Sequence, residues 1–171
     1  MKRQDRQSII FLMLFVFTVI IMNAAVAAAD NNKAPFLIAY LSGDNEAPPA
    51  ETAAQGRILF QLSEDGNELH YKLTVANVAK VTAAHIYLAP EGETGRVIAS
   101  LFDLKEIPRI GSFNGEVAEG VITAGTLVGP LVGSSLSELL REIGEGYTYV
   151  NVLTEEHPQG YIRGRIAAPL N

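Results

Sequence analysis

The chain has 171 residues and a formal net charge of −6, and although 48% of its residues are hydrophobic, none is cysteine. This length suits one domain with a core of its own, and that core cannot be stabilised by disulfides. A copper site built on thiolate ligands is excluded for the same reason. The acidic balance makes nucleic acid and anionic lipid poor partners.

The amino terminus has the order of segments that is typical of a secretory signal. Basic residues come first, an apolar run covers 9–22, and small residues lead to Ala29, which precedes Asp30. We therefore predict a signal peptide over 1–29 that is cleaved after Ala29. The protein is then secreted or otherwise extracytoplasmic.

An uncleaved N-terminal anchor is the alternative, because residues 8–29 carry no charge and are numerous enough to cross a bilayer as a helix. Both alternatives place the rest of the chain outside the cytoplasm. Any contact with a membrane is expected only through this segment. We predict a linker over 30–34 and a single domain over 35–168.

Short apolar runs separated by glycine and other turn residues fill that domain. Most of them alternate apolar and polar side chains, as half-buried strands do. Eight short strands at this spacing favour an all-β, antiparallel, immunoglobulin-like β-sandwich. The predicted strands cover 36–41, 56–62, 69–75, 81–88, 96–101, 115–122, 147–154 and 161–166.

The clearest local prediction is a hairpin between the second and third runs. Gly66 and Asn67 tolerate the positive φ of a tight turn. In the run that follows, alternate apolar side chains should face the core, whereas His70 and Lys72 should face solvent. The expected core residues of this run are Leu69, Tyr71, Leu73 and Val75.

One short helix interrupts the strand pattern. Ser135 and Glu138 have the spacing of a capping box, and Gly144 suits a left-handed stop. At about two turns this helix is too short to be stable alone and must pack on the sheet. Its apolar stripe consists of Leu136, Leu139, Leu140 and Ile143.

Four polar side chains form a candidate binding site, which we call the polar cluster: His85, Tyr87, Asn151 and Arg163. Alternation places His85 and Tyr87 on one face of their strand, so the four side chains meet if their three strands are neighbours. Arg and Tyr are favoured anchors at binding surfaces. The alternative is structural: Asn151 and Arg163 satisfy backbone groups and hold strand ends together.

Several segments resemble the chordin-type domain, usually called CHRD, in the expected order. They include 36–49, the Ala84-His85-Ile86 run, 149–152 and the closing 160–166. The resemblance implies an immunoglobulin-like β-sandwich that is used outside cells. In animal chordin such domains belong to a protein that sequesters secreted growth factors, a role that does not carry over to a small single domain.

The chain also departs from the family pattern. Family members commonly have a histidine where this chain has Tyr87 and another where it has Leu153. If such histidines met across strands they could hold a metal, as in copper/zinc superoxide dismutase. Here only His85 lies where a metal site could form, and zinc usually takes four ligands. We expect no metal and no cofactor.

Catalytic motifs are not evident. No serine lies in a G-x-S-x-G elbow, and the glycine-rich 125–133 lacks the lysine of a phosphate loop. We therefore expect no enzyme but an exported binding or structural module whose partner is an extracellular or envelope protein. A metal-binding protein or metal-dependent oxidoreductase is the alternative, and a mechanical spacer is a third possibility.

Overall fold

The computed structural model describes residues 36–104 and 112–168. The predicted signal peptide or anchor over 1–29 and the linker over 30–34 lie outside these residues. Within the described ranges, no helix is long and apolar enough to span a membrane.

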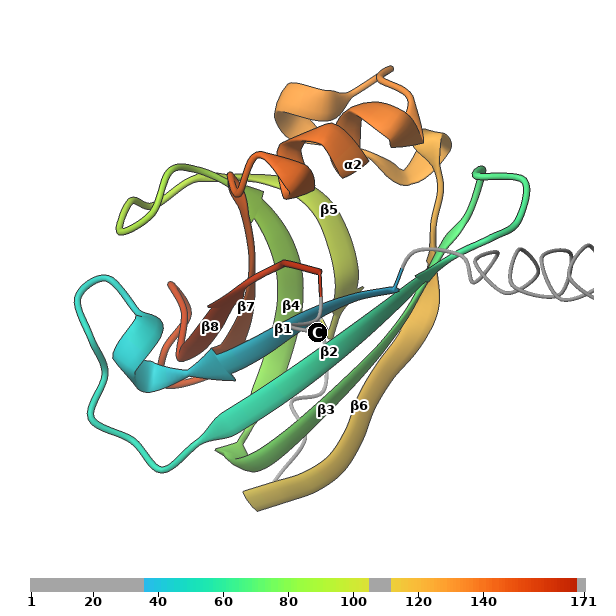
Figure 1. The fold of residues 1–171 in the computed structure, drawn as a ribbon. Helices are drawn as coiled ribbons and strands as arrows, with labels where there is room; N and C mark the ends of the chain where they lie inside the picture. The colour runs from blue at the N-terminus through green and yellow to red at the C-terminus, as the bar shows by residue number, and fades with distance from the viewer. Residues whose placement is uncertain (1–35, 105–111, 169–171) are drawn as a thin grey trace, which may run out of the picture. The chain divides into compact units, whose positions relative to one another are not determined.

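The described chain is built from eight antiparallel strands and one α-helix, so that part of the predicted fold class is confirmed (Figure 1). The strand order across the sheet is β5-β4-β7-β8-β1-β2-β3-β6. The strands are β1 (Phe36–Ser42), β2 (Gln55–Leu62), β3 (Leu69–Ala79), β4 (Val81–Leu88), β5 (Arg96–Asp103), β6 (Ser112–Ile122), β7 (Thr148–Thr154) and β8 (Ile162–Arg165).

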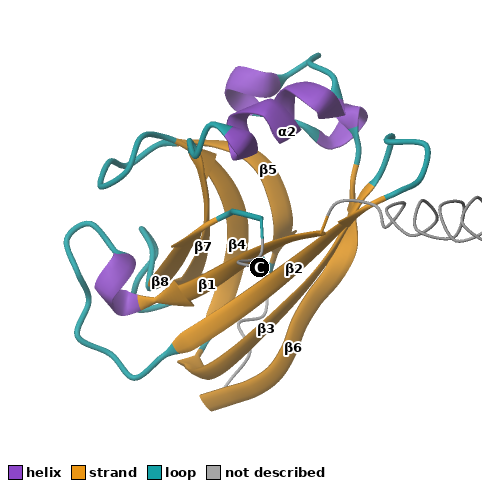
Figure 2. Ribbon diagram, in the orientation of Figure 1, coloured by secondary structure: helices purple, strands orange, loops and turns teal. Residues whose placement is uncertain are grey.

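The eight strands belong to one continuous sheet, which curves until it nearly forms a barrel (Figures 1 and 2). Its two end strands, β5 and β6, contact each other. Strands β1 and β8 meet where Ser42 pairs with Arg163, and Ile38 and Ala167 exchange backbone hydrogen bonds of 2.8 and 3.0 Å just beyond. This narrow seam joins the two halves, which a sandwich would keep as separate sheets.

Alternate side chains of the strands fill the core as predicted. Leu69, Leu73 and Val75 are at most 2% exposed, and Tyr71 is 9% exposed with its hydroxyl donating to the backbone carbonyl of Leu101. The preceding turn contains Gly66 at φ +73°, the conformation for which glycine was predicted there. The Asp65 carboxylate accepts bonds from Ser63 and Asn67, which lower its pKa to about 2.

The predicted helix is α2 (Leu136–Gly144), and it packs its apolar stripe on the sheet. Ser135 is its N-cap, but the predicted capping box is wrong, because the Ser135 side chain caps nothing and Glu138 pairs with Arg141 at 2.7 Å instead. The left-handed stop also lies two residues later than predicted. Gly146 adopts φ +77° and donates to the carbonyl of Ile143.

Candidate functional site

Strands β4, β7 and β8 are neighbours, so their outward-facing side chains form two rows across the sheet. His85, Asn151 and Arg163 are directly paired in the first row. Tyr87, Tyr149 and Arg165 form the second row in the same way. The four residues of the polar cluster therefore lie together on the outer face of the sheet, because the alternate residues of these strands are committed to the core.

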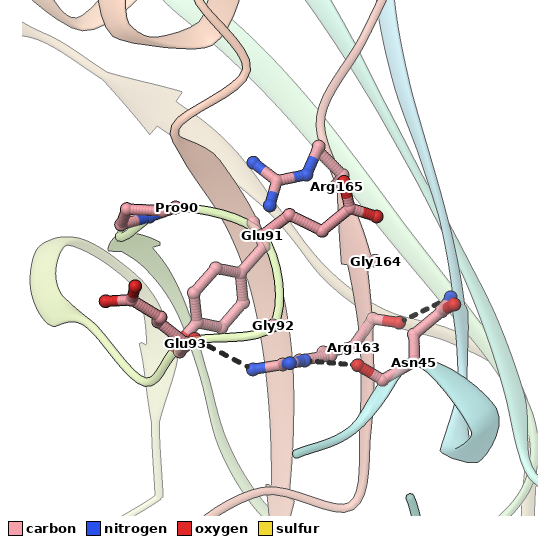
Figure 3. Close-up of a pocket in the computed structure, with 9 residues that line it drawn as sticks. Asn45, Pro90, Glu91, Gly92, Glu93, Arg163, Gly164 and Arg165 are labelled. Carbon is pink, nitrogen blue, oxygen red and sulfur yellow. Dashed lines mark hydrogen bonds between the residues drawn. The ribbon is translucent and has the colours of Figure 1, made fainter. Parts of the chain in front are cut away.

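Arg163 holds two distant loops over this face. Its guanidinium donates to the backbone carbonyl of Asn45 and, at 3.2 Å, to that of Glu93 (Figure 3). Asn45 returns a bond from its side-chain amide to the carbonyl of Arg163 at 3.1 Å. Only 7% of the Arg163 surface is exposed, and its guanidinium satisfies backbone carbonyl groups of both loops.

Stacked aromatic rings support the second of these loops. The rings of Tyr87 and Tyr149 stack with centroids 5.2 Å apart, and the guanidinium of Arg163 lies 4.9 Å from the Tyr149 centroid. The Tyr149 hydroxyl accepts a bond of 3.1 Å from the amide of Gly95. The loop over 90–95 is thus fixed at both Glu93 and Gly95, on the same side of the sheet as the loop after β1 (Figure 2).

Glu46 completes the site, and the strand pattern did not single it out. Its carboxylate lies 3.9 Å from the guanidinium of Arg163. Burial raises the pKa of Glu46, and the charge of Arg163 and a hydrogen bond from Asn151 oppose that rise only in part. Glu46 does fall within the 36–49 segment that resembles the CHRD opening, which was the available signal for it.

His85 occupies a half-buried position at the other end of the first row. Burial lowers the pKa of His85, and the charge of Asp103 opposes that change in part. Its ring lies edge-on to Tyr87, with centroids 6.2 Å apart. A neutral imidazole is therefore favoured in the folded protein.

Protonation of His85 should make stability fall on mild acidification. Because its folded pKa lies below the ordinary 6.5, the unfolded chain binds a proton at pH values where the folded chain does not. The free energy of unfolding should then decrease as pH drops below about 6.5, and His85→Gln should flatten that decrease. Urea unfolding across this range measures the effect, with His70→Gln as the control for losing a histidine.

Replacement of Glu46 should change the pH dependence of the free energy of unfolding in the opposite direction. The pKa of Glu46 in the folded protein lies above the ordinary 4.5. As pH rises above 4.5, the unfolded chain therefore loses this proton more readily than the folded chain, and the free energy of unfolding decreases. Glu46→Gln removes this effect and should make the loss of stability on acidification steeper. Parallel curves for wild type and both variants would contradict the two assignments.

A small pocket opens beside the site, between β8 and the two loops (Figure 3). We call it the arginine pocket, and its volume is about 150 Å³. Its polar walls include two guanidinium groups, one of which, Arg165, was not among the predicted site residues. It is lined by Asn45, Pro90, Glu91, Gly92, Glu93, Tyr149, Arg163, Gly164 and Arg165.

The three histidines do not come together. His70 is exposed on β3 beside Glu68 at 3.1 Å, and His157 stacks on Tyr161 with centroids 4.5 Å apart. Among residues 36–104 and 112–168, no three His, Asp or Glu side chains form a group that could hold a metal ion. No observation therefore favours the metal-dependent alternative.

Comparisons with known proteins agree with the resemblance. The CHRD domain model matches residues 37–166. Chordin from Danio rerio is 31% identical to this chain over 131 residues, which cover 75% of this chain and 13% of that protein. Chordin from Xenopus laevis is 29% identical over 131 residues, which cover 75% of this chain and 12% of that protein. The chain thus spans a small part of these relatives, and no solved structure matches it significantly. Because the family model covers most of its length, the chain belongs to the CHRD domain family.

Proposed function

We propose that the protein is an exported CHRD domain that binds another protein outside the cytoplasm. The observation that carries the proposal is the pair of loops that Arg163 ties over the outer face of β4, β7 and β8. Loops fixed in advance lose little conformational entropy on binding, which is how preorganised recognition surfaces gain affinity.

The polar cluster is proposed as the base of that surface. Asn151 and Arg163 are 3% and 7% exposed, so they act chiefly by positioning the loops. Half-buried His85 and Tyr87 extend the base toward solvent, and the loop residues 44–45 and 90–94 are exposed above it. A partner would therefore contact the loops first and the cluster residues at their margin.

Export and domain character remain parts of this proposal. The order of segments at the amino terminus supports a leader that is cleaved after Ala29, which the mass of the purified protein tests directly. The two facing halves of the sheet support an immunoglobulin-like sandwich. Continuous pairing through β8 and β1 brings that sandwich close to a barrel.

Site-specific photo-crosslinking in the producing cells tests the binding proposal. A photoreactive residue at Glu91, in the exposed loop, should yield a discrete crosslinked protein. The matched control is the same residue at Glu119, an exposed position on β6, which should yield none.

Two outcomes would contradict the proposal. The absence of a discrete product from Glu91 is what a mechanical spacer predicts. An equal product from Glu119 would show that the loops do not form the binding surface.

A further inference from the structure

Arg165 differs from Arg163 in what its guanidinium contacts. The Arg163 group donates to two backbone carbonyls, whereas the Nη1 atom of Arg165 is buried and has no hydrogen-bond partner among the described residues. Both groups line the arginine pocket (Figure 3). The pocket therefore contains one arginine that holds the fold together and one whose donor is unsatisfied.

An unsatisfied, buried, charged donor is costly, and a rotation of the Arg165 guanidinium toward an acceptor in the pocket that it lines would remove the cost. The planar guanidinium fork matches a carboxylate in shape and in charge. With a volume of about 150 Å³, the pocket has room for a carboxylate and its first carbons but not for a folded segment.

The acidic rim limits the charge of the ligand. Glu91 and Glu93 are exposed residues that line the pocket, and the chain as a whole carries a net charge of −6. These charges repel a multiply charged anion such as phosphate more strongly than a single carboxylate. The pocket thus combines a guanidinium whose Nη1 atom has no partner among the described residues with a lining that disfavours dense negative charge.

We infer that the arginine pocket binds a carboxylate group of the partner protein, with Arg165 as the residue that pairs with it. The inference rests on the proposed binding function and adds the chemistry of its ligand. The carboxylate can come from an acidic side chain or from a chain terminus, which present the same group.

NMR titration of the exported, isotope-labelled protein tests the inference with defined probes. Acetyl-glycyl-glycine supplies a terminal carboxylate, and an acetylated, amidated peptide with one glutamate supplies a side-chain carboxylate. The acetylated, amidated glycine dipeptide is the neutral control, and inorganic phosphate is the multiply charged control. Saturable chemical-shift changes at the Arg165 Nε and at the Gly92 and Gly164 amides are expected only with the two carboxylate probes. The probe that binds with the lower Kd shows whether the pocket prefers a chain terminus or an acidic side chain.

Two variants should change the affinity in opposite directions. Arg165→Gln removes a charged hydrogen bond and should raise Kd about tenfold or more. Glu91→Gln removes a repelling rim charge and should lower Kd about twofold. Arg165→Gln should also retain or raise the melting temperature of the wild type, since the Nη1 atom that it removes is buried without a partner among the described residues.

The inference is overturned if the wild type gives no saturable shift, if Arg165→Gln binds the carboxylates as tightly, or if phosphate binds better. Should Arg165→Gln fail to fold, an unchanged affinity in Glu91→Gln would overturn it as well. A failed titration with successful crosslinking from Glu91 would remove only the carboxylate assignment. Carboxylate binding without any crosslinked protein would instead contradict the proposed protein-binding function.

Discussion

Replacing Arg163 with alanine should lower the free energy of unfolding by about 3–5 kcal/mol, the range for removing one partner of a buried charged pair. The substitution leaves the carbonyls of Asn45 and Glu93 without their donor. It also leaves the carboxylate of Glu46, which is 9% exposed, without its nearby cation. Urea unfolding of the purified variant measures the loss.

Three further variants separate the causes of that loss. Arg163→Lys keeps the charge but lacks the planar fork, so its stability should lie between those of wild type and Arg163→Ala. Glu46→Gln should restore part of the stability of Arg163→Ala, because a neutral amide is less costly to bury than an unpaired carboxylate. Arg57→Ala, at an exposed position on β2, is the matched control and should change stability by no more than about 0.5 kcal/mol. Equal effects at Arg57 and Arg163 would refute the role assigned to Arg163.

Replacing Gly164 with alanine should open the seam between β8 and β1. A Cβ at this position would overlap the backbone carbonyl oxygen of Tyr40, and a backbone atom can move only if β1 moves away. Overpacking of this kind typically costs about 1–3 kcal/mol and sometimes more. Hydrogen exchange should report the site of damage, with faster exchange at the amides of Ile38 and Ala167, which bridge the same seam.

The control for this substitution is a glycine with free space around it. Gly144 ends α2, and an added Cβ there would meet nothing within 4 Å. Gly144→Ala should therefore be neutral or stabilising, by up to about 1 kcal/mol, because alanine reduces the entropy of the unfolded chain. If Gly164→Ala retained full stability and slow exchange at Ile38, the seam would not depend on close approach of the two strands.

Sequence periodicity predicted the strands and the rows of side chains well. In 81–88 and 147–154, the alternating pattern predicted that Ile86, Val150 and Val152 face the core, and all three are 0% exposed. Once those residues face the core, His85 and Asn151 must face outward, so their meeting required only that the strands be neighbours. The hairpin at Gly66 was equally predictable, because a tight turn depends on the types of the adjacent residues that form it.

The missed features depend on contacts that are remote in the chain. Arg163 reaches the carbonyl of Asn45, 118 positions earlier, through a backbone atom that every residue type supplies. Glu46 becomes part of the site only because that loop folds back onto β8. At Glu138 a capping-box pattern was present, but the guanidinium of Arg141, one turn further on, competes for the same carboxylate.

The seam also has a consequence for the order in which the molecule can assemble. Synthesis produces β1 first and β8 last, so β1 has a partner on one edge only until the final strand has emerged. Pairings between such distant segments form late and slow the reaction. A nascent chain consequently cannot close its sheet into the nearly barrel-shaped form until β8 has been synthesised.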